Sequence, residues 1–104
     1  MSIAAGRLTT SNFIFDETLS SCLYRLGHAA AQRVGTALLD PDTIDLIRVT
    51  PEDEQAAWTL FRNRSERSYS FTDCTSFALM RRLGIDIALA LDEDFRAEGF
   101  RVMP

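Results

Sequence analysis

The stretches Phe71–Cys74 (FTDC) and Leu91–Phe95 (LDEDF) decide how the rest of this sequence is interpreted. The first opens a predicted helix with Asp73 in its first turn. The second places acidic residues just after a short apolar strand, about one βα unit later along the chain. We expect acids in these two places to meet at the C-terminal edge of a parallel sheet, where α/β folds usually bind ligands. With an earlier acid, Glu17, they would form a three-carboxylate pocket for a hard divalent cation.

Working outward from these stretches, predicted helices alternate with predicted strands along the chain. Between residues 15 and 26, for example, apolar residues recur at the spacing of one helical stripe. The expected strands are 7–9, 45–49, 85–91 and 100–103; the expected helices are 12–26, 28–39, 51–63, one that is capped by Ser70 or Thr72 and ends at Gly84, and a short turn at 92–97; residues 62–70 are expected to form a loop. This alternation predicts an α/β fold with a parallel sheet.

The composition is that of one ordinary soluble domain covering residues 1–104, with 46% hydrophobic and 25% charged residues. No apolar run approaches the roughly 20 residues that cross a membrane, and the N-terminus lacks the apolar stretch of a secretory signal. Cys22 and Cys74 are too far apart for a metal or redox motif, so we interpret them as small buried residues in a reducing cytosol. These features predict a cytoplasmic protein with no membrane partner.

The formal charge of −4 argues against a general nucleic-acid binder, because phosphate contacts need a basic surface. All 11 basic residues are arginine, which suits bidentate phosphate contacts, so a local basic rim at Arg62, Arg64 and Arg67 is compatible with an acidic protein. Trp58 and Phe61 share the third predicted helix. We interpret them as core or dimer-interface residues in preference to base-stacking platforms.

Four segments, in this order, resemble the PIN domain and most closely the VapC-like toxin ribonucleases. They are Leu8–Phe13 leading into Asp16–Leu19, then Tyr24–His28, then Phe71–Phe77, and finally Leu91–Phe95 with Gly99–Phe100. The likeness extends over about residues 7–104, nearly the whole chain. It implies a PIN-like three-layer α/β/α fold with a parallel sheet.

The resemblance also implies roles for individual acids, because PIN domains hold Mg²⁺ or Mn²⁺ with clustered acidic residues and cut RNA. Glu17 matches the acid of the family's second helix, Asp73 the acid that opens the later helix, and Asp92 the acid after the fourth strand. These three are the candidate catalytic and metal-binding residues. Asp94, at a position that the family fills variably, is a further candidate metal ligand.

Thr72 and Arg64 are the candidate substrate-binding residues, although a helix-capping role explains Thr72 equally well. Each acid also has an ordinary interpretation if the resemblance is set aside. Asp73 is then a first-turn acid favoured by the helix dipole, Glu17 a solvated helix residue, and 92–94 an acidic turn.

The sequence departs from the family at its start. PIN domains begin with a strand that carries a nearly invariant aspartate, followed by a helix. Here only six residues precede Arg7 and no acid precedes Asp16. We therefore expect a partial PIN domain whose sheet lacks the central first strand and whose site lacks one metal ligand.

The expected function is that of a Mg²⁺- or Mn²⁺-dependent endoribonuclease resembling the toxin of a type II toxin–antitoxin system. Such a protein hydrolyses RNA phosphodiester bonds, forms a homodimer and is silenced by a VapB-like antitoxin. The alternative is a catalytically inactive PIN remnant that acts as an antitoxin-binding or oligomerisation module.

Overall fold

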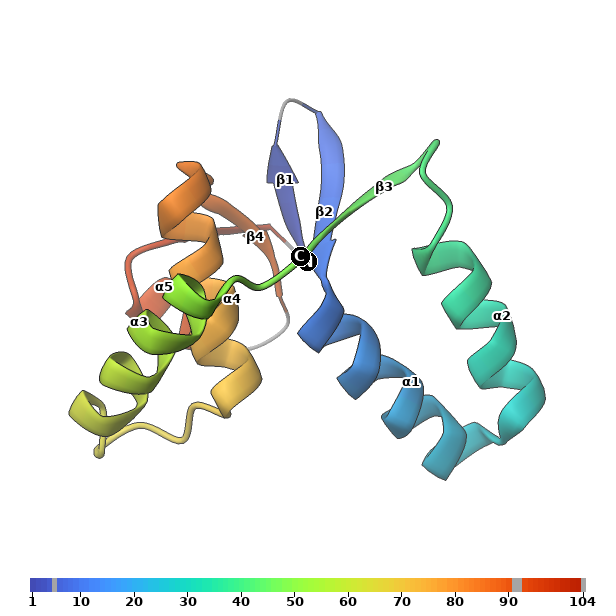
Figure 1. Ribbon diagram of the computed structural model, residues 1–104, viewed down its shortest axis with the longest axis horizontal. Helices are drawn as coiled ribbons and strands as arrows, with labels where there is room; N and C mark the ends of the chain where they lie inside the picture. The colour runs from blue at the N-terminus through green and yellow to red at the C-terminus, as the bar shows by residue number, and fades with distance from the viewer. Residues whose placement is uncertain (5, 91–92, 104) are drawn as a thin grey trace.

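The computed structural model describes residues 1–4, 6–90 and 93–103 and shows helices alternating with short strands (Figure 1). In chain order the elements are β1 (Ser2–Ala4), β2 (Arg7–Ser11), α1 (Asn12–Leu26), α2 (His28–Leu38), β3 (Ile44–Ile47), α3 (Pro51–Asn63), α4 (Phe71–Leu83), β4 (Ile87–Leu89), α5 (Asp94–Ala97) and β5 (Arg101–Met103). The α/β fold predicted from the sequence is confirmed. Within the described ranges, no helix combines the length and apolar character needed to cross a membrane.

The strands form one sheet in the order β3-β2-β1-β4-β5. Strand β2 pairs in parallel with β3, and β4 pairs in parallel with β5, whereas β1 is antiparallel to both of its neighbours. The four outer strands therefore share one direction and the sheet is mostly parallel, as expected.

A short strand stands at the centre of the sheet. We expected the acid-bearing first strand of the family to be missing, and β1, which fills the central place, is a three-residue antiparallel strand without an acid, with Ser2 opposite Thr9 on one side and Ala88 on the other. Gly6, with φ +76°, lies where the chain reverses between β1 and β2, in a conformation that glycine adopts without strain. The sequence signal was too weak to find a strand of three residues, but the backbone groups of two neighbouring strands supply its hydrogen-bond partners.

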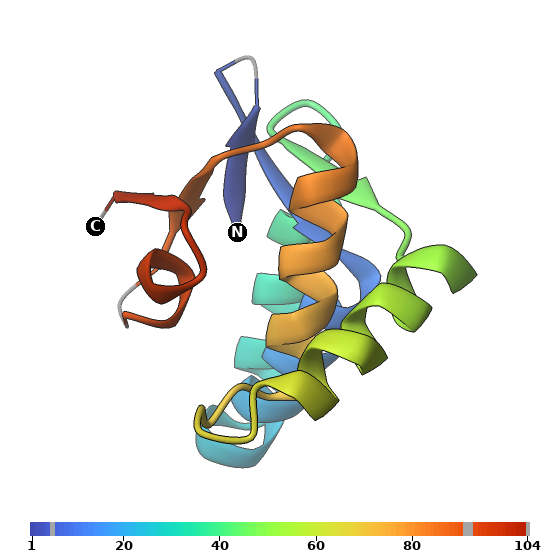
Figure 2. The ribbon, with the colours of Figure 1, turned by 90° about the vertical axis from the view of Figure 1, so that its left-hand side faces the viewer.

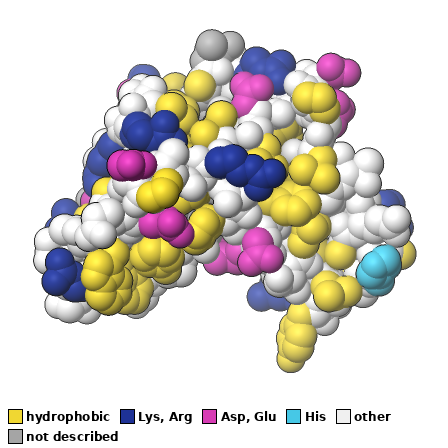
Figure 3. Space-filling model, viewed as in Figure 1, with side chains coloured by type: hydrophobic (Ala, Val, Ile, Leu, Met, Phe, Trp, Pro, Cys, Tyr) yellow, Lys and Arg dark blue, Asp and Glu magenta, His cyan; other side chains and the backbone are white. Residues whose placement is uncertain are grey.

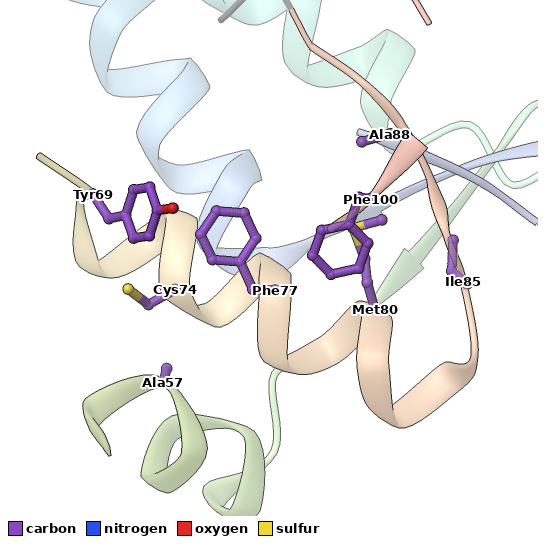
Figure 4. Close-up of a cluster of buried hydrophobic side chains, with 8 residues drawn as sticks. All are labelled: Ala57, Tyr69, Cys74, Phe77, Met80, Ile85, Ala88 and Phe100. Carbon is purple, nitrogen blue, oxygen red and sulfur yellow. The ribbon is translucent and has the colours of Figure 1, made fainter. Parts of the chain in front are cut away.

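Helix α4 carries most of the core, and its buried side chains lie on more than one side of the helix, with Cys74 and Phe77 pointing in different directions (Figure 4). Phe77 is fully buried, and its ring centroid lies 5.1 Å from that of Tyr69, 4.8 Å from that of Phe95 and 5.8 Å from that of Phe100. These contacts hold α5 and the chain before β5 against α4.

An ion pair joins α3 to α4, which lie side by side in Figures 1 and 2. Asp53 belongs to a capping box with Thr50 at the start of α3 and also accepts two hydrogen bonds from Arg82, at 2.8 and 2.9 Å. Hydrogen bonding from Arg82 is the main reason that the pKa of Asp53 lies below its usual value. The buried carboxylate thus fixes the distance between the two helices.

Helices α3 and α4 form one helical arm of the molecule, and α1 and α2 form a second arm that extends away from the sheet (Figure 1). They pack closely at Gly35, where a Cβ atom would lie 3.1 Å from Cδ2 of Leu19. The fold therefore consists of a sheet from which two helical arms project, with α4 at the centre of the core.

Candidate active site

The N-terminal ends of α1 and α4 lie next to each other. The rings of Phe13 on α1 and Phe71 on α4 have centroids 6.3 Å apart. Each helix begins at a serine N-cap, Ser11 for α1 and Ser70 for α4, whose hydroxyl accepts a backbone hydrogen bond from the first turn. The start of α1, whose second turn carries Glu17, and the first turn of α4, which carries Asp73, are thus brought together from distant parts of the sequence.

A small hollow of about 10 Å³ lies between these helices, the sheet and α5. Its lining includes Thr10 and Ser11 of β2, Ile14 of α1, Ser76 of α4 and Phe95 of α5. The hydroxyl oxygen of Thr10 is buried and has no hydrogen-bond partner in the described part of the chain. A space of this size suits about one water molecule, which would satisfy that hydroxyl.

The predicted acids that the structure describes are not among the lining residues, but they belong to helices that line the hollow. Glu17 and Asp73 each stand three residues from a lining residue of their own helix, and residues three apart share a helix face. Asp94 directly precedes Phe95, which lines the hollow. The space-filling view shows acidic side chains at the base of the hollowed region between the two arms (Figure 3).

Asp92 lies outside the described residues, so its position relative to the other acids is not part of the structure. Among residues 1–4, 6–90 and 93–103, no group of three His, Cys, Asp or Glu side chains is arranged to hold a metal ion. The structure thus brings together the elements that carry Glu17, Asp73 and Asp94, but these described acids do not by themselves form a three-ligand group.

Asp73 has the most defined geometry of these acids. Its Oδ2 accepts a hydrogen bond of 3.0 Å from the backbone N–H of Ser70, while its own N–H donates to the Ser70 hydroxyl, also at 3.0 Å. Its Oδ1 makes no hydrogen bond to any residue that the structure describes. One oxygen therefore fixes the carboxylate on the first turn of α4, and a metal-binding role for Asp73 stays a prediction.

The capping role considered for Thr72 belongs to Ser70. Thr72 is the second residue of α4, and its carbonyl oxygen accepts a hydrogen bond of 2.7 Å from the hydroxyl of Thr75. Glu17, one turn into α1, is exposed and makes no ion pair with the residues described. The substrate-binding role of Thr72 stays a prediction.

Arg64 is held by an acid that sequence reasoning missed. Its Nε donates to Glu98 at 2.7 Å, and Arg81 donates to the other carboxylate oxygen at 2.9 Å. Burial alone would raise the pKa of Glu98, whose side chain is only 4% exposed, but hydrogen bonds from Arg64 and Arg81 lower it overall. Burial, helped by Glu98, raises the pKa of the nearby Tyr69 to about 12.

No sequence signal distinguished Glu98 from a surface acid, because its two arginine partners are 34 and 17 residues away along the chain. The ion pair between Arg64 and Glu98 holds Arg64 beside the loop that follows α3. A substrate-binding role for Arg64 stays a prediction. If Arg64 binds substrate, it does so while it also holds Glu98.

The arrangement suits chemistry on a phosphodiester. Carboxylate oxygens are the ligands that Mg²⁺ prefers, and one or two protein carboxylates with substrate phosphate usually complete such a site. The first turns of α1 and α4 also point backbone N–H groups toward this end of the molecule, where the helix dipoles favour negative charge.

Comparisons with known proteins bear on the family and the fold of the chain. The model of the PIN domain family matches residues 2–100 of the chain. The 23S rRNA-specific endonuclease VapC20 of Mycobacterium tuberculosis is 44% identical over 92 residues, which cover 88% of this chain and 69% of the relative, in each of two strains. The crystal structure of VapC20 from the same organism, described as a sarcin-ricin loop cleaving toxin, superposes with a TM-score of 0.84 and 40% identity, covering 90% of this chain and 72% of that one.

Proposed function

Because the chain belongs to the PIN domain family, we propose that it is a divalent-metal-dependent endoribonuclease of the VapC toxin type. It hydrolyses RNA phosphodiester bonds. The observation that carries this proposal is Asp73, whose Oδ2 is fixed by the cap of α4 while Oδ1 has no partner within the described chain, beside the start of α1. The 44% identity to VapC20 supports ribosomal RNA as the substrate class and a cytoplasmic setting.

The donor set fits Mg²⁺ or Mn²⁺, because the candidate residues offer hard carboxylate oxygens. Glu17, Asp73 and Asp92 would hold the ion, with Asp94 as a fourth contributor. When bound, such an ion lowers the pKa of a coordinated water and offsets charge on the attacked phosphate. The protein's part is to hold the carboxylates in place, and the hydrogen bond from Ser70 to Asp73 does this on the α4 side.

A second candidate function is that of an inactive module that binds an antitoxin or oligomerises. One observation favours it. The central strand Ser2–Ala4 carries no acid, whereas the first strand of the family is expected to carry one. Metal binding distinguishes the two candidates, since the inactive module needs no ion.

Removing divalent metal is expected to abolish RNA cleavage. Purified protein should cut 23S rRNA in the presence of Mg²⁺, lose this activity in EDTA, and regain it when Mg²⁺ or Mn²⁺ is added in excess. Calorimetry should show stoichiometric Mn²⁺ binding. Cleavage that is unchanged in EDTA would contradict the metal mechanism, while an absence of both cleavage and Mn²⁺ binding would favour the inactive module.

The α1–α2 arm is the surface best suited to a protein partner, which we propose is a VapB-like antitoxin. Its exposed apolar side chains are Leu23, Tyr24, Leu26 and Leu39, with exposures of 52, 92, 72 and 57%. A groove between the two helices, of about 460 Å³, adjoins them. Leu23 and Leu39 line this groove, and exposed apolar side chains around a groove are typical of protein–protein contacts. We also propose that the chain forms a homodimer.

Leu26→Glu is expected to weaken antitoxin binding by at least about 10-fold, because it places a charge in an apolar contact. Leu83→Glu, on the other arm and 41% exposed, is the matched control and should bind normally. Titration calorimetry with the antitoxin gives both affinities, and light scattering gives the mass, which should be twice 11.7 kDa for the chain alone. Equal affinities for the two variants would show that the arm is not the binding surface.

A further inference from the structure

Two aromatic side chains at the C-terminal half of α3 are exposed instead of buried. Trp58 is 47% and Phe61 42% exposed, so of the two predicted roles, core or dimer interface, the core is wrong and the dimer interface stays a prediction. Their rings stack on each other with centroids 6.0 Å apart and planes inclined by 18°. Such a pair presents a flat apolar surface to solvent, at the end of α3 that lies at the lower left of Figure 1.

Arginine side chains surround this pair. The Arg62 guanidinium carbon lies 5.7 Å from the centroid of the Trp58 ring. Arg62, Arg64 and Arg67 line one surface hollow of about 340 Å³ together with Trp58 and Phe61. In Figure 3 the same corner of the molecule shows hydrophobic atoms beside basic ones. We call this surface, formed by these five residues, the aromatic–arginine platform.

The platform is basic although the chain as a whole carries a net charge of −4. Within the described part of the chain Arg62 and Arg67 form no ion pair. Two acids lie near these arginines: Glu66, which is next to Arg67 in the sequence and exposed, and Glu98, which binds Arg64. Three arginines therefore face two glutamates at this surface. An acidic protein that concentrates positive charge around exposed aromatic rings favours a ligand that is both flat and negatively charged.

Single-stranded RNA has this combination, because its bases stack on aromatic rings and its phosphates pair with arginine. A second copy of the chain fits less well, since a symmetric contact would bring together two copies of the same arginine-rich patch. We propose that the aromatic–arginine platform binds an unpaired nucleotide of the RNA substrate, with its base on Trp58 and its backbone on Arg62 and Arg67. This proposal rests on the proposed ribonuclease function.

The position of the platform supports this role. The ring of Phe61 lies 6.3 Å from that of Phe71, which in turn lies 6.3 Å from that of Phe13. Phe71 is the first residue of α4 and stands two residues before Asp73. An RNA strand whose phosphate reaches Asp73 can therefore place a neighbouring nucleotide on the platform, outside the acidic region.

The test measures RNA binding without cleavage. A fluorescein-labelled single-stranded oligoribonucleotide is titrated with protein in EDTA, and binding is followed by anisotropy. Trp58→Ala is expected to weaken binding about 5- to 150-fold, the range found for loss of one base–aromatic stack, and Trp58→Phe should retain most of the affinity. Arg67→Gln should reduce the slope of log affinity against log salt by about 0.7. Arg101→Gln, which removes an exposed arginine paired with Asp86, should bind as the wild type does.

Trp58 is the single tryptophan of the chain, so its own fluorescence in the wild type gives a second measurement. Unlabelled RNA should quench it at saturation. Binding by Trp58→Ala that equals the wild type, or no quenching at saturation, would overturn the proposal, and so would conversion of a dimer to a monomer by Trp58→Ala in light scattering. Weakened binding by Trp58→Ala in a protein that never cleaves RNA would support the platform and contradict only the ribonuclease function.

Discussion

Asp73→Asn is expected to lower the rate of RNA cleavage by at least about 100-fold and to leave the fold intact. The substitution removes the charge with which Asp73 Oδ1 would hold a divalent ion, and small displacements of a reacting group already cost about that factor. The fold should survive because an amide oxygen can still accept the hydrogen bond that Asp73 Oδ2 now accepts from Ser70. Cleavage assays in Mg²⁺ and thermal unfolding measure the two effects separately.

Ser70→Ala is the matched control, because it disturbs the same helix start without touching the carboxylate. Loss of the hydroxyl that accepts from the Asp73 N–H should cost about 0.5–2 kcal/mol of stability, the usual cost of losing an N-cap. Below its unfolding transition this variant should still cleave RNA within a few-fold of the wild type. If Asp73→Asn retained activity while Ser70→Ala lost it, Asp73 would be a capping residue alone.

The local elements of this fold are readable from the sequence because their ends are chemically marked. Thr50-Pro51 at the start of α3 and Gly84 after α4 fix helix ends that depend on only a few neighbouring residues. Asp73 could be singled out as a first-turn acid of α4, whereas Glu17 was singled out by the family resemblance alone. Local chemistry of this kind does not require knowledge of the tertiary structure.

The features that the sequence did not reveal depend on partners far away along the chain. Strand β1 has three residues and is defined by its pairing with β2 and β4. Glu98 differs from a surface acid because it binds Arg64 and Arg81. Trp58 is exposed because no other described element covers it. Apolar spacing shows which face of a helix is apolar, but it cannot show whether another element covers that face.

Phe77→Ala is expected to destabilise the protein by about 3–5 kcal/mol, the usual cost of removing a buried phenylalanine side chain. Phe77 is fully buried and its ring contacts those of Tyr69, Phe95 and Phe100, so no single neighbour can fill the space that is left. For a domain whose total stability is of the order of 5–15 kcal/mol, this is a large share. Urea unfolding monitored by circular dichroism measures it, and the melting temperature should fall by at least about 12 °C.

The same substitution should impair the site even at temperatures where the protein is folded. Phe95 holds α5 against Phe77, and Asp94 is the residue before it, so the cavity at position 77 loosens one of the three elements around the candidate active site. Phe77→Leu, which fills most of the space, should cost about 1.5 kcal/mol or less and preserve cleavage. If Phe77→Ala were folded at 15 °C and cleaved RNA as fast as Phe77→Leu there, the packing of Phe95 on Phe77 would matter for stability but not for the position of α5 in the site.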